Sequence, residues 1–446
     1  MTDIPVAEPQ TTPETAAAAT PAATPTATLG RWAARIPPLL RHQPFRRYWS
    51  AQTVSLFGDQ ISAIALPLLA VLVLHAGAAQ MGYLNALIWL PSLLFALHAG
   101  AWVDRRGHRR ATMIVADLGR ALLLASIPVC YALGVLNLWQ LYVVTFGVGT
   151  LSVLFSVSER AVFVALVDSG QYVEGSSLVY GSRAMSFVAG NSLGGLLVQA
   201  LTAPFAVAAD ALSFLGSAFF LCRIRPAEAP PDETRTGALS AGVRFILRSG
   251  IIRSALACVA TVNFFNFMFF ALFFLYASRS LHVKPGALGL VLGVGAIGSV
   301  IGSLLTGRLA ARVGIGWAYI IGCIVFTVPM ILVPLANGPL WLVLGMLFTA
   351  EFLSGFGVMV LDISFGAVSA RVIPDAVRSR VTGAFQAVNY GTRPVGALVG
   401  GFLGTWIGLR PTLWIAAVGG ALAFLLALPS PLRRYRMPAA AVEQLA

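Results

Sequence analysis

Three charged residues lie deep inside stretches that are otherwise apolar, and their types suit the movement of protons. Asp59 is eleven residues past Tyr48, where one apolar stretch begins, and Glu351 is equally deep in a later one. At ~1.5 Å per residue, eleven helical residues cover about 16 Å, which is near the middle of a bilayer. A charge at that depth is unfavourable unless it is neutralised, forms an ion pair or contacts water. We therefore interpret Asp59, Glu351 and Arg393 as proton-coupling candidates.

Asp59 and Arg393 also have other interpretations. Asp59 could be a carboxylate that backbone, serine or asparagine neighbours satisfy, and it could equally bind a cationic group. Arg393 requires a carboxylate, a cavity or an anionic substrate, and Asp59 and Glu351 are its candidate partners. Pro394 follows it directly and can bend that helix and free backbone carbonyls.

The composition indicates that these residues belong to a membrane protein. Mean hydropathy is +0.82 and 11% of residues are charged, whereas about 25% is usual in soluble chains. The apolar runs do not alternate with polar residues, which disfavours a transmembrane β-barrel. We expect an all-α polytopic membrane protein with twelve transmembrane helices, at roughly 48–74, 80–100, 110–133, 140–161, 175–201, 205–223, 252–280, 286–309, 316–336, 340–369, 379–408 and 411–429.

Arginine clusters orient these helices. The chain has 29 arginines and a single lysine, and they gather in short loops on one side of the predicted membrane. This pattern fits the positive-inside rule rather than nucleic-acid binding, and it places both termini in the cytosol. The expected organisation is a disordered cytosolic tail (1–42), a six-helix bundle (43–224), a cytosolic linker with an amphipathic helix that can lie on the membrane surface (225–250), a second six-helix bundle (251–430) and a cytosolic tail (431–446).

Aromatic and amide side chains form a second group of candidates. NFFNFMFFALFFLY (263–276) mixes phenylalanines with two asparagines at i, i+3, and NYGTRP (389–394) adds another polar patch. Part of the first run must face lipid, so lining of a cavity and simple lipid contact both stay open. A bulky amphipathic molecule would suit such a wall, and the substrate-cavity candidates are Asn263, Asn266, Phe267, Phe270, Asn389 and Tyr390.

Two further sets of polar residues are interpreted as structural. Asp117 and Arg120 are spaced i, i+3 and can form a charge pair on one face of a helix. Asp210 stands near the start of the sixth helix, where packing or capping explains it better than transport.

The two halves of the chain repeat. Gly100, Arg105 and Gly107 recur as Gly307, Arg312 and Gly314, all at an offset of 207, and Gly82 maps to Gly289 at the same offset. GNSLGG (190–195) matches GALVGG (396–401) at an offset of 206. Landmarks that keep one offset indicate two parallel six-helix halves.

The stretch GAWVDRRGHRR (100–110) resembles the signature of the major facilitator superfamily, Gly-x-x-x-Asp-Arg-x-Gly-x-Arg-Arg. The repeat copy has Ala311 where the aspartate would stand. The four arginines alone would make this a positive-inside anchor, whereas the Gly-x-x-x-Asp spacing favours a gating contact with the start of helix eleven. The gating candidates are Gly100, Asp104, Arg105, Gly107, Arg109 and Arg110, with Gly307, Arg312 and Gly314 in the repeat.

Other segments are similar to the drug–proton antiporter branch that includes macrolide exporters and the enterobactin exporter. They include SLFGDQ (55–60) and an Asp-Ala-x-Ser-Phe pattern at 210–214. GNSLGG resembles the antiporter motif Gly-Pro-x-x-Gly-Gly with Asn191 in place of proline, and Gly190, Asn191, Gly194 and Gly195 are interpreted as a helix-packing motif. The resemblance implies proton-driven export from the cytosol, across the cytoplasmic membrane of a bacterium.

Several classes of function are excluded or disfavoured. Lys284 is followed by Pro285, so the chain lacks a phosphate-binding loop, and we expect neither an enzyme nor any cofactor or metal site. We expect a monomer that contacts a small-molecule substrate, protons and membrane lipids, and no nucleic acid. The main hypothesis is a multidrug exporter working by alternating access. The alternatives are a narrow-specificity metabolite or siderophore exporter, which a deep arginine would suit, and a membrane sensor that does not transport.

Overall fold

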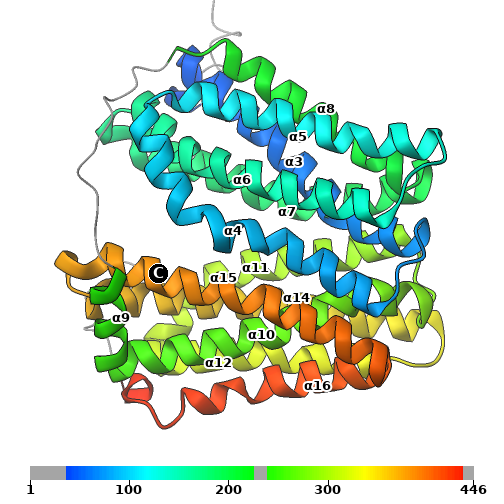
Figure 1. The fold of residues 1–446 in the computed structure, drawn as a ribbon. Coiled ribbons are helices and arrows are strands. Elements are labelled where there is room, and N and C mark those ends of the chain that lie inside the picture. The colour runs from blue at the N-terminus through cyan, green and yellow to red at the C-terminus, as the bar shows by residue number, and fades with distance from the viewer. Residues whose placement is uncertain (1–36, 226–238, 435–446) are drawn as a thin grey trace, which may run out of the picture.

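The computed structural model describes residues 37–225 and 239–434, and within them every regular element is a helix. The first half holds α3 (Gln43–Leu72), α4 (Ala78–Arg106), α5 (Arg109–Ala132), α6 (Leu138–Leu166), α7 (Tyr172–Leu201) and α8 (Ala203–Cys222). The second half holds α10 (Gly250–Arg279), α11 (Pro285–Val313), α12 (Ile315–Thr327), α13 (Leu332–Leu335), α14 (Leu340–Val372), α15 (Asp375–Trp406) and α16 (Leu409–Leu422). Figure 1 shows one half stacked on the other, with α9 (Leu239–Arg248) at one end of the bundle.

The two halves pack by the same scheme, as the repeat in the sequence predicts. In the first half α3 packs on α7 and α8, and α6 packs on α4 and α5. In the second half α10 packs on α15 and α16, and α14 packs on α11 and α12. Between the halves, the main contacts join α7 to α11 and α4 to α15. The two contacts are equivalent, because the repeat relates α4 to α11 and α7 to α15.

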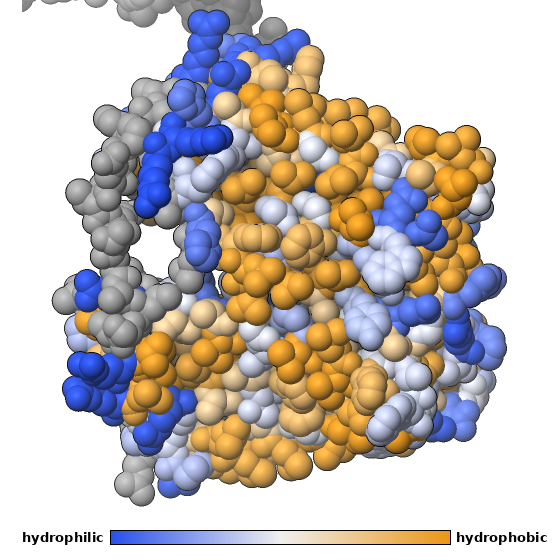
Figure 2. All heavy atoms as spheres, viewed as in Figure 1, coloured by the Kyte–Doolittle hydropathy of each residue, from blue (hydrophilic) through white to orange (hydrophobic). Residues whose placement is uncertain are grey.

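Apolar side chains cover the middle of the bundle on at least one face (Figure 2). On the face seen in Figure 2, hydrophobic residues cover the centre and hydrophilic residues gather at the two ends. Among the described residues, eleven segments are long and apolar enough to cross a membrane. The remaining long helix, α15, has 32 residues but is more polar, with Asn389 and Arg393 near its middle. The chain is thus a multi-pass membrane protein, and the twelfth span stays a prediction.

Prolines and glycines explain where several helices differ from the expected spans. The span predicted at 316–336 is broken into α12, a 3-10 turn from Val328 to Ile331, and α13, because Pro329 cannot continue the α-helical hydrogen bonds. Gly107 and Gly314 follow α4 and α11 with φ of 67° and 86°. Only glycine adopts such angles without strain, so this part of the repeated motif is a helix stop.

Some residues assigned to tails and linkers belong to the folded part. The short helix α2 (Pro38–Arg41) buries Leu39, whose N–H donates to Glu174 Oε1 at 3.1 Å, so the first tail ends earlier than residue 42. Leu432 is also buried, within the segment expected as the second tail. The amphipathic helix predicted within the linker 225–250 is present as α9. Its Ile246 is buried in a cluster with Val381 and Ala384 of α15, so protein covers that side chain.

The halves touch most closely at the end where α4 begins and α15 ends, which we call the far end. The opposite end, where α4 ends and α9 lies, is called the arginine-rich end. A Cβ on Gly195 would lie 2.7 Å from Cα of Gly289, and one on Gly82 would lie 2.8 Å from Cα of Gly401. Side-chain carbons do not approach that closely, so each crossing requires glycine on both helices.

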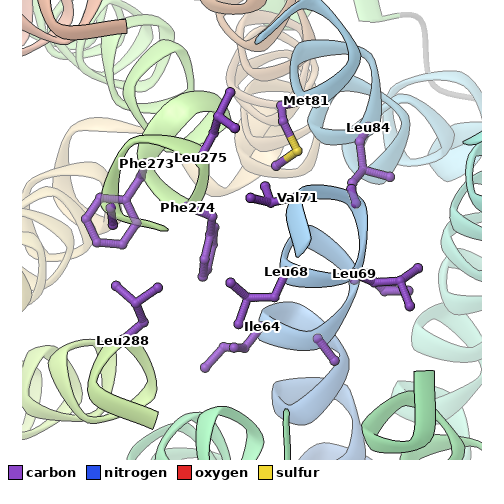
Figure 3. Close-up of a cluster of buried hydrophobic side chains, with 14 of the residues drawn as sticks. Ile64, Leu68, Leu69, Val71, Met81, Leu84, Phe273, Phe274, Leu275 and Leu288 are labelled. Atoms are coloured by element: carbon purple, nitrogen blue, oxygen red, sulfur yellow. The ribbon is translucent and has the colours of Figure 1, made fainter. Parts of the chain in front are cut away.

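Apolar side chains fill the space between these glycine crossings. In Figure 3, Phe274 of α10 is directed toward Leu68 and Ile64 of α3, and Met81 and Leu84 of α4 lie nearby. Two hydrogen bonds also join the halves here, from Ala79 N to Thr405 Oγ1 at 3.1 Å and from Gly286 N to Gln199 Oε1 at 3.0 Å. The far end is therefore sealed by close packing.

Candidate functional site

A cavity of about 650 Å³ lies between the two halves, next to the apolar seal. Its walls come from α3, α4, α6, α7 and α8 of the first half and from α10, α11, α12 and α14 of the second. Most of the lining is apolar, and its charged members among the described residues are Asp59, Asp210 and Glu351. A volume of this size holds a drug-sized molecule, and the charge that faces it is acidic.

Asp59, for which the sequence predicts a deep position, lies on the α3 wall of the cavity. It is half-buried and makes no ion pair with any described residue. Arg120 and Arg183 are the cations whose charge reaches it. Asp59 therefore faces the cavity, and its role in proton coupling stays a prediction.

Asp210 is brought to the same wall, which the interpretation as a packing or capping residue did not anticipate. It is 1% exposed, accepts hydrogen bonds from Ser62 and Ser213, and still contributes to the cavity lining. Gly58 makes this possible, because a Cβ there would collide with Asp210 and Ser213 of α8. The Asp-Ala-x-Ser-Phe pattern points to this residue in the sequence, but as part of a family resemblance alone it does not indicate a place in the cavity.

Glu351 lies on the opposite wall, in α14 of the second half. Its side chain is 7% exposed and lines the cavity, and its Oε1 has no hydrogen-bond partner among the described residues. The neighbouring Gly295 of α11 leaves room for it, since a Cβ at that position would lie 3.3 Å from Glu351 Oε2. A buried carboxylate without partners is unfavourable when it is charged.

Arg393 is paired with neither Asp59 nor Glu351, so the expected partners are wrong. Its Nε and Nη2 donate to Asn389 Oδ1 of the preceding turn at 3.1 and 2.9 Å. Its guanidinium lies 4.1 Å from the ring centre of Trp89 and 5.0 Å from those of Phe267 and Tyr390. A cation is stabilised over aromatic faces, so three rings surround the guanidinium, and the negative charge of Asp362 on α14 also reaches it.

Trp89 joins this aromatic cage to the cavity. It belongs to α4 of the first half, whereas the other two rings and Arg393 belong to the second. Trp89 and Phe267 line the cavity, and Arg393 is not among the lining residues. The sequence offered no signal for Trp89, because a tryptophan in an apolar helix normally suggests packing or lipid contact.

The aromatic candidates divide between the cavity and other places. Asn266, Phe267 and Phe270 line the cavity. Asn263 instead donates to Val259 O of its own helix at 2.9 Å. Asn389 is occupied by Arg393, and Tyr390 stacks on Trp89 with ring centres 6.2 Å apart. The aromatic run of α10 therefore faces the cavity around Asn266. The residues of NYGTRP pack against the side of the wall that is away from the cavity.

Asp117 and Arg120 form the ion pair that their spacing predicts, and both are buried. Arg120 also lies over Phe155 and Phe214, at 4.4 and 4.1 Å from the ring centres. These contacts tie α5 to α6 and α8 inside the first half. The pair does not line the cavity, which supports its structural interpretation.

Replacing Asp117 with asparagine is expected to destabilise the protein. The change leaves the guanidinium of Arg120 buried without its carboxylate, and breaking a buried pair in this way costs about 3–5 kcal/mol. The melting temperature in detergent should fall clearly. The double variant Asp117→Asn/Arg120→Met should recover much of the loss, and a double variant that is less stable than Asp117→Asn would contradict the assignment.

The superfamily signature lies at the arginine-rich end, with its members in different roles. Arg105 and Arg106 are exposed, and Arg110 donates to the carbonyl oxygens of Leu221 and Cys222 at 2.9 and 2.6 Å, which caps the end of α8. Nothing lies within 4 Å of a Cβ built on Gly100. The side chain of Asp104 lies outside the described residues. Among the described residues no helix approaches Gly100 closely, and gating by this motif stays a prediction.

In the repeat copy, Gly307 is buried inside α11 and Arg312 is exposed near its end. Ala311, which stands at the aspartate position, is exposed as well. The two copies therefore share a helix stop and a terminal arginine.

The motif GNSLGG packs α7 against two helices at once. A Cβ on Gly190 would lie 2.7 Å from Gln60 Cβ of α3, and a Cβ on Gly194 would lie 3.0 Å from Ile61 Cα of the same helix. Gly195 meets α11 at the far end, and Asn191 is buried and lines the cavity. The helix-packing interpretation fits these contacts.

Comparison with protein families gives one match over almost the whole chain. The family model described as transmembrane secretion effector matches residues 33–444. Two curated relatives also match. The uncharacterized MFS-type transporter YfiS of Bacillus subtilis is 26% identical over 390 residues, which is 83% of this chain and 89% of the relative. The multidrug efflux pump Tap of Mycolicibacterium fortuitum is 28% identical over 373 residues, 80% of this chain and 88% of the relative.

Solved structures share the fold at low sequence identity. A bacterial homologue of the human lysosomal transporter Spinster, in an inward-facing and unoccupied conformation, aligns with a TM-score of 0.68 at 13% identity. It covers 91% of this chain and 100% of its own. A bacterial homologue of the iron transporter ferroportin, in an inward-facing state, gives a TM-score of 0.67 at 16% identity and covers 88% and 99%. These similarities concern the fold alone.

Proposed function

Because the chain belongs to the transmembrane secretion effector family of major facilitator transporters, we propose that it exports amphipathic small molecules in exchange for protons. Transport by a multi-pass membrane protein follows from the family. The substrate class, the coupling ion and the direction are our proposal. The observation that carries it is the cavity between the halves, which combines aromatic walls with acidic side chains.

The charge of the cavity favours neutral and cationic substrates over anionic ones. Asp59, Asp210 and Glu351 face the cavity, whereas Arg393 is held behind Trp89 and Phe267. An anion would meet uncompensated carboxylates there, which disfavours it. The deep arginine therefore no longer supports an exporter of anionic siderophores or acids, and the likeness to the efflux pump Tap supports drug-like compounds.

The arrangement of the halves supports alternating access. Glycine crossings and apolar side chains seal the far end, and the motif glycine at the arginine-rich end is not closely packed. With the arginine-rich end in the cytosol, as the positive-inside rule predicts, the described state would receive substrate from the cytosol. We propose the cytoplasmic membrane of a bacterium as its location, a twelfth span in α15, and a monomer as the working unit.

Proteoliposomes that contain the purified protein test this function. With an acidic interior, protons leave along their gradient, and ethidium, a planar organic cation, should accumulate inside. A protonophore should abolish the accumulation, and an anionic amphipathic dye should not accumulate. If no amphipathic compound moves and substrate addition causes no proton flux, the antiporter proposal fails and a non-transporting sensor becomes the better explanation.

A further inference from the structure

We propose that Asp59 and Asp210 form a two-carboxylate site in the first half that holds one exchangeable proton between them. The inference rests on the proposed function, because it names the site at which the coupling proton is carried. It adds Asp210, which is buried in α8 and which the sequence suggested for packing alone.

Two sequence motifs meet in space at this site. SLFGDQ supplies Gly58 and Asp59, and the segment 210–214 supplies Asp210 and Ser213. The missing side chain of Gly58 lets α8 approach α3 until Asp210 and Ser213 occupy the place of a Cβ. One turn after Asp59, Ser62 donates to Asp210, and Ser213 donates to the other oxygen at 3.0 Å.

The surrounding charges leave this pair unbalanced. The charged groups around it are Asp117 and Arg120 of α5, Glu159 of α6 and Arg183 of α7. Arg120 is bound to Asp117 in the buried ion pair, and Arg183 is exposed, with a charge that reaches both Asp59 and Glu159. Among the described residues, neither arginine forms an ion pair with Asp59 or Asp210.

Asp59 directly follows Gly58, which packs against Asp210. Ser62, one turn later, donates to Asp210, so the two carboxylates are neighbours in a membrane interior. Two adjacent carboxylates without an ion-pair partner are unfavourable there when both are ionised, and sharing one proton relieves their repulsion. The hydroxyl donors suit the charged member of the pair, because a carboxylate accepts hydrogen bonds with both oxygens.

The pair also has one buried and one accessible member, which gives the proton a route. Asp210 is 1% exposed, whereas Asp59 is half-buried at the cavity wall. When a cationic substrate enters the cavity, the proton can leave from Asp59 to water, and the positive charge of the substrate then compensates the second carboxylate. Rebinding reverses this single transfer, in which an O–H bond breaks on one side and forms on the other.

The test measures proton release by purified protein in weakly buffered detergent solution when ethidium is added. Wild type is expected to release protons, and Asp210→Asn and Asp59→Asn should each lose that release. The double variant should lose no more than either single variant, because the two residues act as one unit. Glu174→Gln, a carboxyl variant away from the cavity, serves as the matched control and should behave as wild type. Release from Asp210→Asn at the wild-type level would overturn the proposal.

Exchange of labelled substrate between the two sides of a liposome, without any gradient, separates coupling from folding. Asp210→Asn should retain this exchange while it loses proton release, and a loss of both in folded protein would assign Asp210 to structure and overturn the proposal. The proposal would also be overturned if, at constant pH, added sodium ions took the place of the proton in substrate exchange, because the pair would then bind a metal cation.

Infrared spectroscopy keeps the proposal testable if Asp210→Asn does not fold. In the Glu351→Gln background, which removes the other cavity carboxyl, the protein should show a carboxylic-acid C=O band that Asp59→Asn removes. A band that persists unchanged would contradict a shared proton. This readout needs no transport, so a protein that moves no substrate but shows the band would overturn the proposed function alone.

Discussion

Glu351→Gln is expected to abolish the accumulation of ethidium in proteoliposomes while leaving the protein folded. Glu351 is the acidic residue that the second half contributes to the cavity, and its Oε1 has no partner among the described residues. Glutamine keeps the shape and removes the charge that a cationic substrate would meet. A hydrogen bond to a charged group contributes about 1.5–3 kcal/mol, roughly 10- to 150-fold in affinity, so binding of ethidium should weaken by about this factor.

The comparison with a neutral amphipathic substrate makes this expectation specific. If Glu351 attracts the substrate's positive charge and the pair Asp59–Asp210 carries the proton, Glu351→Gln should impair the neutral compound far less than ethidium. Glu174→Gln is the matched control, because it makes the same change of side chain at a carboxylate that does not line the cavity. Equal loss for both compounds would show that Glu351 carries the proton, and unchanged ethidium transport would remove it from the site.

Depth along a helix could be predicted from the sequence, whereas the direction in which a side chain points could not. Counting residues placed Asp59 and Glu351 near the membrane centre, and both reach the cavity. The same counting gave Arg393 the wrong partners, because its surroundings come from α4 and α10, far away in the chain. Which helices meet is decided by packing between halves, and no local pattern records it.

The repeat was a stronger source of prediction than any single motif. The offsets of 207 and 206 relate Gly82 to Gly289 and Gly195 to Gly401. In the structure these glycines meet crosswise, Gly82 with Gly401 and Gly289 with Gly195. Once the contact of Gly82 with Gly401 is known, the pseudo-symmetry of the halves predicts the contact of Gly289 with Gly195. Hydropathy, by contrast, does not identify α15 as a span, because a helix that supports an internal cage needs polar residues.

Gly289→Leu is expected to stop net transport by preventing the far end from closing. A Cβ at this position would lie 2.6 Å from Asn191 O and 2.8 Å from Gly195 Cα, both on the opposite half. Overpacking a close contact costs about 1–3 kcal/mol, and a bias of that size shifts a two-state equilibrium by about 5- to 150-fold. Ethidium accumulation should fall by a similar factor, because the state sealed at the far end becomes rare.

The direction of this shift distinguishes a gate from ordinary packing. A cysteine placed in the cavity should become more reactive toward an impermeant thiol reagent added at the far end when Gly289→Leu is present. Gly345→Leu is the matched control, since nothing lies within 4 Å of a Cβ at that glycine of α14. If Gly289→Leu transports normally, or loses transport without any gain in far-end reactivity, the glycine crossings are structural contacts and the seal that opens must lie elsewhere between the halves.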